Sequence, residues 1–157
     1  MRWCEPVPEI ERKFKVETLP EDVGGPGAEI CQGYLSVELV EIRLRARDDA
    51  RELTMKSLGG LRRVEVALPL TPEQFDELWP LVTTFVEKSR HLVQLTGALA
   101  EVDVYGGKLR GLTVVEVEFA SEEEAASFVP PHWFGDEITE DSRFRNAALA
   151  LAGKAPA

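Results

Sequence analysis

Polar and apolar residues alternate along most of this chain, and the alternation predicts a protein built mainly from β-strands. The first clear segment is Glu9-Ile10-Glu11-Arg12-Lys13-Phe14. Because successive side chains of a strand point to opposite faces, Glu9, Glu11 and Lys13 share one face of this segment. A single polar face of this kind is typical of any surface strand, so its meaning depends on the rest of the chain.

The same alternation recurs at hairpin spacing and predicts eight strands. Their ranges are 8–16, 28–36, 37–47, 53–56, 61–70, 84–96, 98–105 and 111–120. Turn residues separate neighbouring strands, among them the glycines and prolines of 17–27, Asp48-Asp49 and Gly59-Gly60. Eight short strands at this spacing favour an antiparallel barrel.

Three helices are predicted beside these strands. Thr71-Pro72-Glu73-Gln74 is typical of a helix start, with a Thr N-cap, Pro at the first position and Gln at the capping-box position, and this helix should end near Pro80. Ser121 to Glu124 predicts a second capping box and a helix through about Val129. Residues 139–152, rich in Ala and Leu, predict a terminal helix. The expected fold class is α+β, an eight-stranded antiparallel barrel with helices packed outside.

Charged residues two positions apart mark one face of most predicted strands. The pairs are Arg43 with Arg45, Arg63 with Glu65, Lys88 with Arg90, and Glu116 with Glu118. The alternate residues are mostly apolar, and only the helices are available to cover them. We therefore expect the charged face to line the barrel interior and the apolar face to lie outside, under the helices. Such an interior must pair or hydrate its charges, and the set contains both signs.

Composition narrows the classes of function. The 157 residues suit one domain, 1–157, with 44% hydrophobic and 29% charged residues. A net charge of −10 argues against a non-specific nucleic-acid binder. No apolar run approaches the ~18 residues of a membrane span, and the N-terminus lacks the apolar core of a signal peptide, so we expect a cytoplasmic protein without membrane partners. Cys4 and Cys31 form no Cys-x-x-Cys pair and are expected to be free thiols.

The expected interior combines two kinds of chemistry. Carboxylates on opposed strands are oxygen ligands for Mg²⁺ or Mn²⁺. Clustered arginines and lysines bind phosphoryl oxygens, arginine as a two-pronged fork and lysine as a point charge. Both together suit a metal–triphosphate complex, in which an in-line water attacks a phosphoryl group whose charge is neutralised.

An ordered series of motifs in this chain resembles the CYTH, or triphosphate tunnel metalloenzyme, superfamily. The likeness begins with the ExExK signature at Glu9, Glu11 and Lys13 and spans about residues 8–150. It continues through Gln32-Gly33-Tyr34-Leu35, Ile42-Arg43-Leu44-Arg45, Lys56 with Gly59-Gly60, Val86-Glu87-Lys88-Ser89-Arg90, Val102-Asp103-Val104-Tyr105, Val115-Glu116-Val117-Glu118-Phe119 and Trp133-Phe134-Gly135-Asp136-Glu137-Ile138-Thr139. This resemblance implies an eight-stranded tunnel with charged residues inside, whose members hydrolyse or cyclise triphosphates with divalent metal.

Within that superfamily the short chain looks like the compact bacterial branch, which includes inorganic triphosphatases. The likeness implies cleavage of tripolyphosphate to pyrophosphate and phosphate, with Lys56 and Tyr34 helping to activate the water. It implies metal ligands at Glu9, Glu11, Glu116 and Glu118. It implies phosphate-binding residues at Lys13, Arg43, Arg45, Lys56, Arg63, Lys88 and Arg90, with Glu65 and Asp103 as further acids of the tunnel.

Two positions depart from the family pattern and keep other functions open. Ala67 stands where a second glutamate is usual, and Phe144 stands where a tyrosine is common. Thiamine triphosphate or a nucleoside triphosphate, hydrolysed or cyclised, is an alternative substrate, and a non-catalytic polyphosphate-binding module is a third hypothesis. The expected partner is a small-molecule triphosphate. A homodimer formed through apolar strand faces also stays open.

Overall fold

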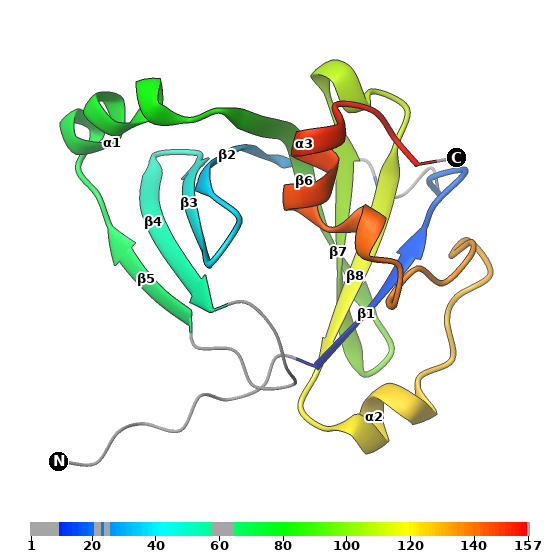
Figure 1. Cartoon of the computed structure of the whole chain (residues 1–157). Coiled ribbons are helices and arrows are strands. Elements are labelled where there is room, and N and C mark those ends of the chain that lie inside the picture. Colours follow the sequence, from blue (N-terminus) through cyan, green and yellow to red (C-terminus); the bar gives the residue numbers. More distant parts are fainter. Residues whose placement is uncertain (1–9, 21–22, 24–25, 58–64, 157) are drawn as a thin grey trace, which may run out of the picture.

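The computed structural model describes residues 10–20, 23, 26–57 and 65–156. Within these ranges the protein is α+β, with one eight-stranded antiparallel sheet and a few short helices. The strands follow the order β1-β8-β7-β6-β2-β3-β4-β5. Figure 1 shows the sheet strongly curved, with β2 to β5 as a first wing and β6 to β8 with β1 as a second wing.

The eight predicted strands are all present. Their bounds are β1 (Ile10–Lys15), β2 (Ala28–Ser36), β3 (Val40–Arg47), β4 (Ala50–Ser57), β5 (Glu65–Pro69), β6 (Thr84–Leu95), β7 (Ala98–Tyr105) and β8 (Thr113–Phe119). In the described part of the chain, β1 and β5 are the two edges, and no ladder joins them. The open antiparallel sheet is therefore established, while the neighbouring segments 1–9 and 58–64 lie outside the described residues.

The predicted helix at Thr71 is confirmed. It is α1 (Pro72–Leu78), followed by a 3-10 turn η1 (Trp79–Leu81), and the Thr71 side chain and the Gln74 side chain form the reciprocal capping box. The second predicted helix is α2 (Glu122–Ser127), where the Ser121 hydroxyl accepts from the Glu124 amide. Its box is only half formed, because the Glu124 carboxylate accepts from the amide of Ala120 instead.

The predicted terminal helix over 139–152 was wrong in its start. The chain forms a 3-10 turn η3 (Ser142–Phe144) and then α3 (Asn146–Ala152); another 3-10 turn, η2 (Gly107–Leu109), precedes β8. The residues before η3 are held to β1 instead of continuing a helix. The amide of Lys13 donates to the Thr139 hydroxyl oxygen at 3.0 Å, and the amide of Ile138 donates to the Lys13 carbonyl at 2.8 Å.

The apolar face of the second wing is covered on the outside, but the cover includes the non-helical segment after α2 and is not made by helices alone. Phe14, Val102 and Val117 point to this face and pack with Phe134 in one buried cluster. Trp133 lies edge-on to Phe134, with ring centroids 4.4 Å apart. These contacts come from the segment that follows α2, so the outer face of β1, β7 and β8 is a hydrophobic core.

The expectation that every helix lies outside is wrong for α3. Leu149 and Phe144 are buried in a second cluster with Val86 and Tyr105, which share the sheet face of the charged residues. Figure 1 shows α3 on the inner side of the curve, against β6. The reason lies in the strands: at this end of the face the inward positions are apolar or aromatic, and the apolar sequence of α3 can cover them. No helix in the described ranges is long and apolar enough to cross a membrane.

Candidate functional site

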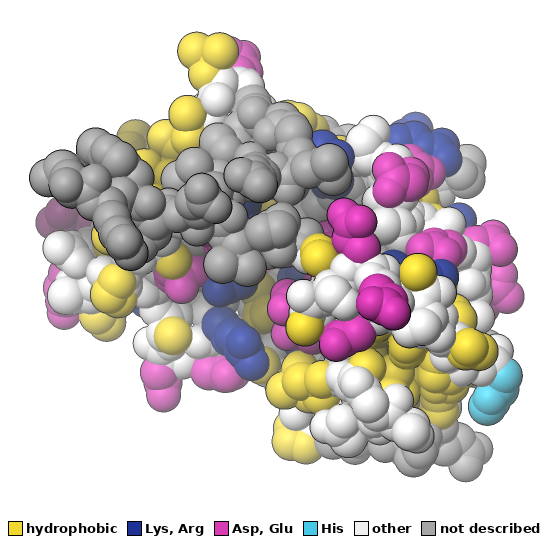
Figure 2. Space-filling model, turned by 90° about the horizontal axis from the view of Figure 1, so that it is seen from below, with side chains coloured by type: hydrophobic (Ala, Val, Ile, Leu, Met, Phe, Trp, Pro, Cys, Tyr) yellow, Lys and Arg dark blue, Asp and Glu magenta, His cyan; other side chains and the backbone are white. Residues whose placement is uncertain are grey.

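Strand register brings the predicted charged residues onto one face of the sheet, named here the polar face. Residues directly opposite each other in antiparallel strands carry their side chains on the same side. In the first wing the register aligns Tyr34 with Arg43, Arg43 with Thr54, and Lys56 with Glu65. In the second wing it aligns the pairs Lys13–Glu116, Glu101–Glu116, Arg90–Asp103 and Lys88–Tyr105. In Figure 2 basic and acidic side chains gather near the centre of the molecule.

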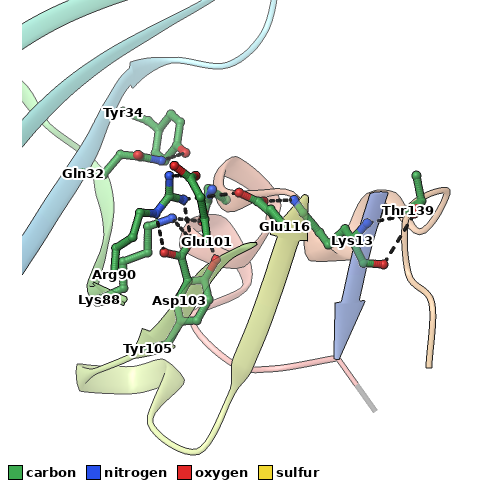
Figure 3. A network of polar contacts seen from close by, with 11 residues as sticks. Lys13, Gln32, Tyr34, Lys88, Arg90, Glu101, Asp103, Tyr105, Glu116 and Thr139 are labelled. Carbon is green, nitrogen blue, oxygen red and sulfur yellow. Dashed lines mark hydrogen bonds and ion pairs between the residues drawn. The ribbon is translucent and has the colours of Figure 1, made fainter. Parts of the chain in front are cut away.

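Arg90 is the centre of the ion-pair network in the second wing (Figure 3). Its guanidinium forks onto Asp103, with Nε 2.7 Å from Oδ1 and Nη2 2.7 Å from Oδ2. The same group contacts Glu101 and lies 3.3 Å from Glu116 Oε2. Asp103 also accepts from Lys88 Nζ at 2.5 Å. The sequence predicted Lys88, Arg90 and Asp103 on one face, and the structure brings their side chains into contact there.

Opposite charges in this network keep Asp103, Glu116 and Arg90 ionised, whereas burial outweighs Asp103 at Lys88 and lowers its pKa. Burial alone would raise the pKa of the Asp103 carboxyl, but Lys88 and Arg90 outweigh burial and keep its pKa below the usual value. The same balance lowers the pKa of Glu116, whose carboxylate lies 2.5 Å from Lys13 Nζ. Burial would lower the pKa of Arg90, but the surrounding carboxylates raise it, so Arg90 stays positive.

A second network lines the first wing. Arg43 Nη2 donates to the Thr54 hydroxyl at 3.2 Å, and Arg45 Nη2 lies 3.0 Å from Glu52 Oε1. Lys56 Nζ lies 2.6 Å from Glu65 Oε2. Burial chiefly, and the neighbouring Arg43 in addition, lower the pKa of Arg45.

One donor of this wing has no partner in the described residues. The Nε atom of Arg43 is buried and makes no hydrogen bond there. Buried polar atoms in folded proteins are nearly always satisfied, so an orphaned donor calls for an explanation. On a face crowded with cations, an anion with several oxygen acceptors would supply the missing bond.

Tyr34 lies on the polar face but is fully packed. Its hydroxyl receives a 2.5 Å hydrogen bond from Gln32 Nε2, and both residues are 2% exposed. Burial raises the pKa of Tyr34 strongly, so its hydroxyl stays protonated at neutral pH. Because the bond from Gln32 uses an oxygen lone pair, the tyrosine proton remains available to another acceptor.

The predicted metal ligands are only partly assembled. Glu11 and Glu118 are direct partners in the β1–β8 register, whereas Glu116 already pairs with Lys13 and Arg90. Glu9 lies outside the described residues, and within the described ranges no group of three or more metal-ligating side chains converges. Two carboxylates facing each other repel unless a cation lies near them, and their hard oxygen atoms suit a divalent ion such as Mg²⁺.

Several residues of the polar face were missed from sequence. They are Lys15, Gln32, Glu52, Thr54, Glu101, Tyr105 and, from α3, Asn146. All but Asn146 lie two or, for Glu52, four residues from a predicted site residue on the same strand, so strict period-2 counting would have found them. Asn146 follows from no strand pattern; its side-chain oxygen accepts from the Tyr105 hydroxyl at 2.6 Å. Arg63 lies outside the described residues.

The structure shows the surroundings of Ala67 and Phe144, the two positions that depart from the family pattern. Ala67 lies opposite Thr54 in the β4–β5 register, so the face has a methyl group where a carboxylate was expected. Phe144 is 1% exposed, and the ammonium of Lys15 lies 5.1 Å from its ring centroid. A phenyl ring without a hydroxyl therefore fits the core under α3.

The chain was compared with known proteins. No family model matches it. An inorganic triphosphatase of Nitrosomonas europaea is 47% identical over 148 residues, covering 92% of this chain and 97% of the relative. An inorganic triphosphatase of Acetivibrio thermocellus is 31% identical over 145 residues, covering 90% and 92%. A crystal structure of an inorganic triphosphatase aligns with a TM-score of 0.73 and 42% identity, covering 94% of this chain and 97% of that one.

Proposed function

The chain belongs to the inorganic triphosphatase branch of the CYTH superfamily, and we propose that it hydrolyses inorganic tripolyphosphate to pyrophosphate and phosphate with divalent metal. The observation that carries the proposal is the polar face. It gathers cations from β1, β3, β4 and β6 with carboxylates from β1, β7 and β8 on one side of one sheet.

We extend the proposal to a closed tunnel. The inward curve of the sheet and the position of β1 and β5 as its two edge strands support it. A closed tunnel would exclude bulk water from the charges and so strengthen their action on a phosphate. A single domain, a cytoplasmic location and a small-molecule triphosphate as the partner remain part of this proposal.

The basic residues would hold the phosphates. Arg43 and Arg45 offer forked donors, and the orphaned Nε of Arg43 supports a place for a phosphoryl oxygen beside them. Lys13, Lys56 and the more distant pair Lys88 and Arg90 add positive charge on the same face. Burial and, after it, the neighbouring Arg43 lower the pKa of Arg45, and an anion beside the two arginines would offset both effects.

The acidic residues near the start of β1 and the end of β8 would hold the metal. Glu11 and Glu118 face each other and fit a divalent cation, with Glu9 and Glu116 as the neighbouring carboxylates. Bound Mg²⁺ or Mn²⁺ would neutralise charge on the triphosphate and polarise its phosphoryl oxygens. Lys13 is two residues from Glu11 on β1 and pairs with Glu116, so it would contact the phosphate nearest the metal.

Lys56 and Tyr34 would orient the attacking water. Lys56 reaches the polar face from β4 and is paired with Glu65, and this pair can orient a water by accepting and donating hydrogen bonds. Tyr34 is kept protonated by burial, so its part would be that of a hydrogen-bond donor. The reaction then depends on positioning and on neutralised charge, as phosphoryl transfer generally does.

The test is phosphate release from tripolyphosphate by the purified chain. Turnover is expected with Mg²⁺ or Mn²⁺ and not after chelation with EDTA, and added metal should restore it. Turnover that is unaffected by EDTA would remove the metal from the proposal, and an absence of turnover with every metal would remove the enzymatic function.

A further inference from the structure

Arg12 lies between Glu11 and Lys13 in sequence but on the opposite, outer face of β1. The guanidinium is bound through all three nitrogen atoms. Nε and Nη2 fork onto Glu137, at 2.9 Å from Oε1 and 2.7 Å from Oε2. Nη1 donates to the carbonyl oxygens of Ala125 and Phe128, each at 3.0 Å, at the end of α2. Such a complete set of partners is more than a solvated surface arginine needs.

Glu137, the partner of Arg12, is linked to β1 through Thr139. Glu137 Oε1 also accepts from the Thr139 hydroxyl at 2.8 Å, and the Thr139 oxygen accepts from the amide of Lys13 at 3.0 Å. The carbonyl of Lys13 accepts from the amide of Ile138 at 2.8 Å. Arg12, Glu137 and Thr139, named here the Arg12 clamp, therefore hold both main-chain groups of Lys13 together with the segment that follows α2.

The same segment continues along the free edge of β1. The amide of Gly135 donates to the Lys15 carbonyl at 2.8 Å, and the amide of Lys15 donates to the Asp136 carbonyl at 2.9 Å. A Cβ atom at Gly135 would lie 3.0 Å from that Lys15 carbonyl, so the close approach needs a glycine. Within the described residues β1 is an edge strand, and its position depends on these contacts as well as on β8.

We propose that the Arg12 clamp is a positioning device for the reaction, which fixes from outside the sheet where Glu11 and Lys13 stand inside it. The inference rests on the proposed function, in which Glu11 holds metal and Lys13 holds phosphate. Glu11 and Lys13 are the immediate neighbours of Arg12, and a strand transmits a shift of one residue to both neighbours on its other face. Small displacements of catalytic groups carry a large kinetic penalty.

The test compares clamp variants in the whole chain. Arg12→Lys keeps the charge and removes the fork, Glu137→Gln removes the acceptor charge, and Thr139→Val removes the hydroxyl while keeping the shape. Arg143→Lys is the matched control, because Arg143 forks onto Asp141, with Nη2 2.7 Å from Oδ2, and its side chain is 61% exposed. Each protein is titrated with Mn²⁺ alone, and thermal unfolding and the kcat and KM for tripolyphosphate are measured in parallel.

The clamp variants should weaken Mn²⁺ binding about tenfold, as loss of residues supporting a metal ligand does, and the control should not. The double variant Arg12→Lys with Glu137→Gln should shift the Mn²⁺ affinity no further than either single change, since both act through one path. Thr139→Ser should restore what Thr139→Val loses. A merely structural role would lower Tm and leave the Mn²⁺ affinity and kcat of the folded protein unchanged, and that result would overturn the inference.

Glu11→Gln separates this inference from the proposed function. If Glu11→Gln loses Mn²⁺ while all clamp variants bind it like the unchanged protein, the positioning role fails and the metal site stands. If Glu11→Gln binds Mn²⁺ normally, the metal assignment itself fails, and the clamp inference with it. Should Arg12→Lys not fold, Glu137→Gln and Thr139→Val decide, because they leave the guanidinium in place.

Discussion

The ammonium of Lys88 lies 2.5 Å from the carboxylate of Asp103, and the two side chains are only 2% and 1% exposed. Charges so deeply buried are tolerated only when each is compensated. Asp103 compensates Arg90 as well, through the fork described above. One carboxylate therefore neutralises two cations at the centre of the polar face, and the stability of the fold depends on it.

Asp103→Asn should destabilise the protein by about 3–5 kcal/mol, because it leaves Lys88 buried without its counter-charge and takes the fork from Arg90, which keeps only Glu101 and Glu116 as carboxylate partners. Urea unfolding would measure the loss. Asp141→Asn is the control: Asp141 pairs with the exposed Arg143, and its replacement should change the unfolding free energy far less. An equal loss of unfolding free energy in the two variants would show that the buried Lys88–Asp103 pair contributes no more to stability than an exposed pair.

Acid should destabilise the fold through Asp103 and Glu116. Both carboxyls have a pKa that is lower in the folded protein than in the unfolded chain. Their contribution to stability is thus fully present above the unfolded values of about 4 and is lost as the pH falls through the lower folded values. Urea unfolding at pH values from 6 down to 2 should show a decline that begins near pH 4. A free energy of unfolding that is constant or rises over this range would contradict the pairing.

The alternation of residues predicted the strands well because it reflects one physical requirement: each strand separates a charged side from an apolar side. Glu11, Lys88, Arg90 and Glu118 could be assigned to one face on this basis alone. The β2 range, 28–36, was predicted without error. Local pattern and tertiary environment agree in these segments, so sequence was sufficient.

Tertiary contacts decided the rest. The sequence pattern predicts a helix starting at Thr139, but the Thr139 hydroxyl oxygen accepts a hydrogen bond from the amide of Lys13. No local pattern reveals a partner 126 residues away. The terminal helix looked like an outer helix, yet Leu149 packs against inward residues of β6 and β8. Arg12 falls on the outward face of its strand, and the alternation alone would indicate a solvated side chain there. Its partners come from the segment after α2, which sequence spacing cannot place.

Glu118→Gln should abolish metal-dependent turnover while the protein stays folded. The change removes one of the two carboxylates that face each other between β1 and β8, and with it a charged oxygen ligand. Glu123→Gln, on the exposed side of α2, is the matched control and should keep full activity. Circular dichroism would verify the fold of both. Wild-type turnover in Glu118→Gln would remove this residue from the metal site.

Tyr34→Phe should lower kcat for tripolyphosphate by about 100-fold if the tyrosine donates a hydrogen bond in the transition state. The loss of the bond from Gln32 should reduce stability by about 1 kcal/mol. Steady-state kinetics and urea unfolding measure the two effects separately. A variant that loses stability but keeps its kcat would show that Tyr34 is a packing residue.

We expect the polar face to break one phosphoanhydride bond of inorganic tripolyphosphate. ³¹P NMR of the reaction with Mg²⁺ or Mn²⁺ follows this cleavage, with thiamine triphosphate and ATP run alongside. We expect pyrophosphate and phosphate in equal amounts from tripolyphosphate and much slower change of the other two substrates. Faster turnover of an organic triphosphate, or tight binding of tripolyphosphate without any product, would contradict the account.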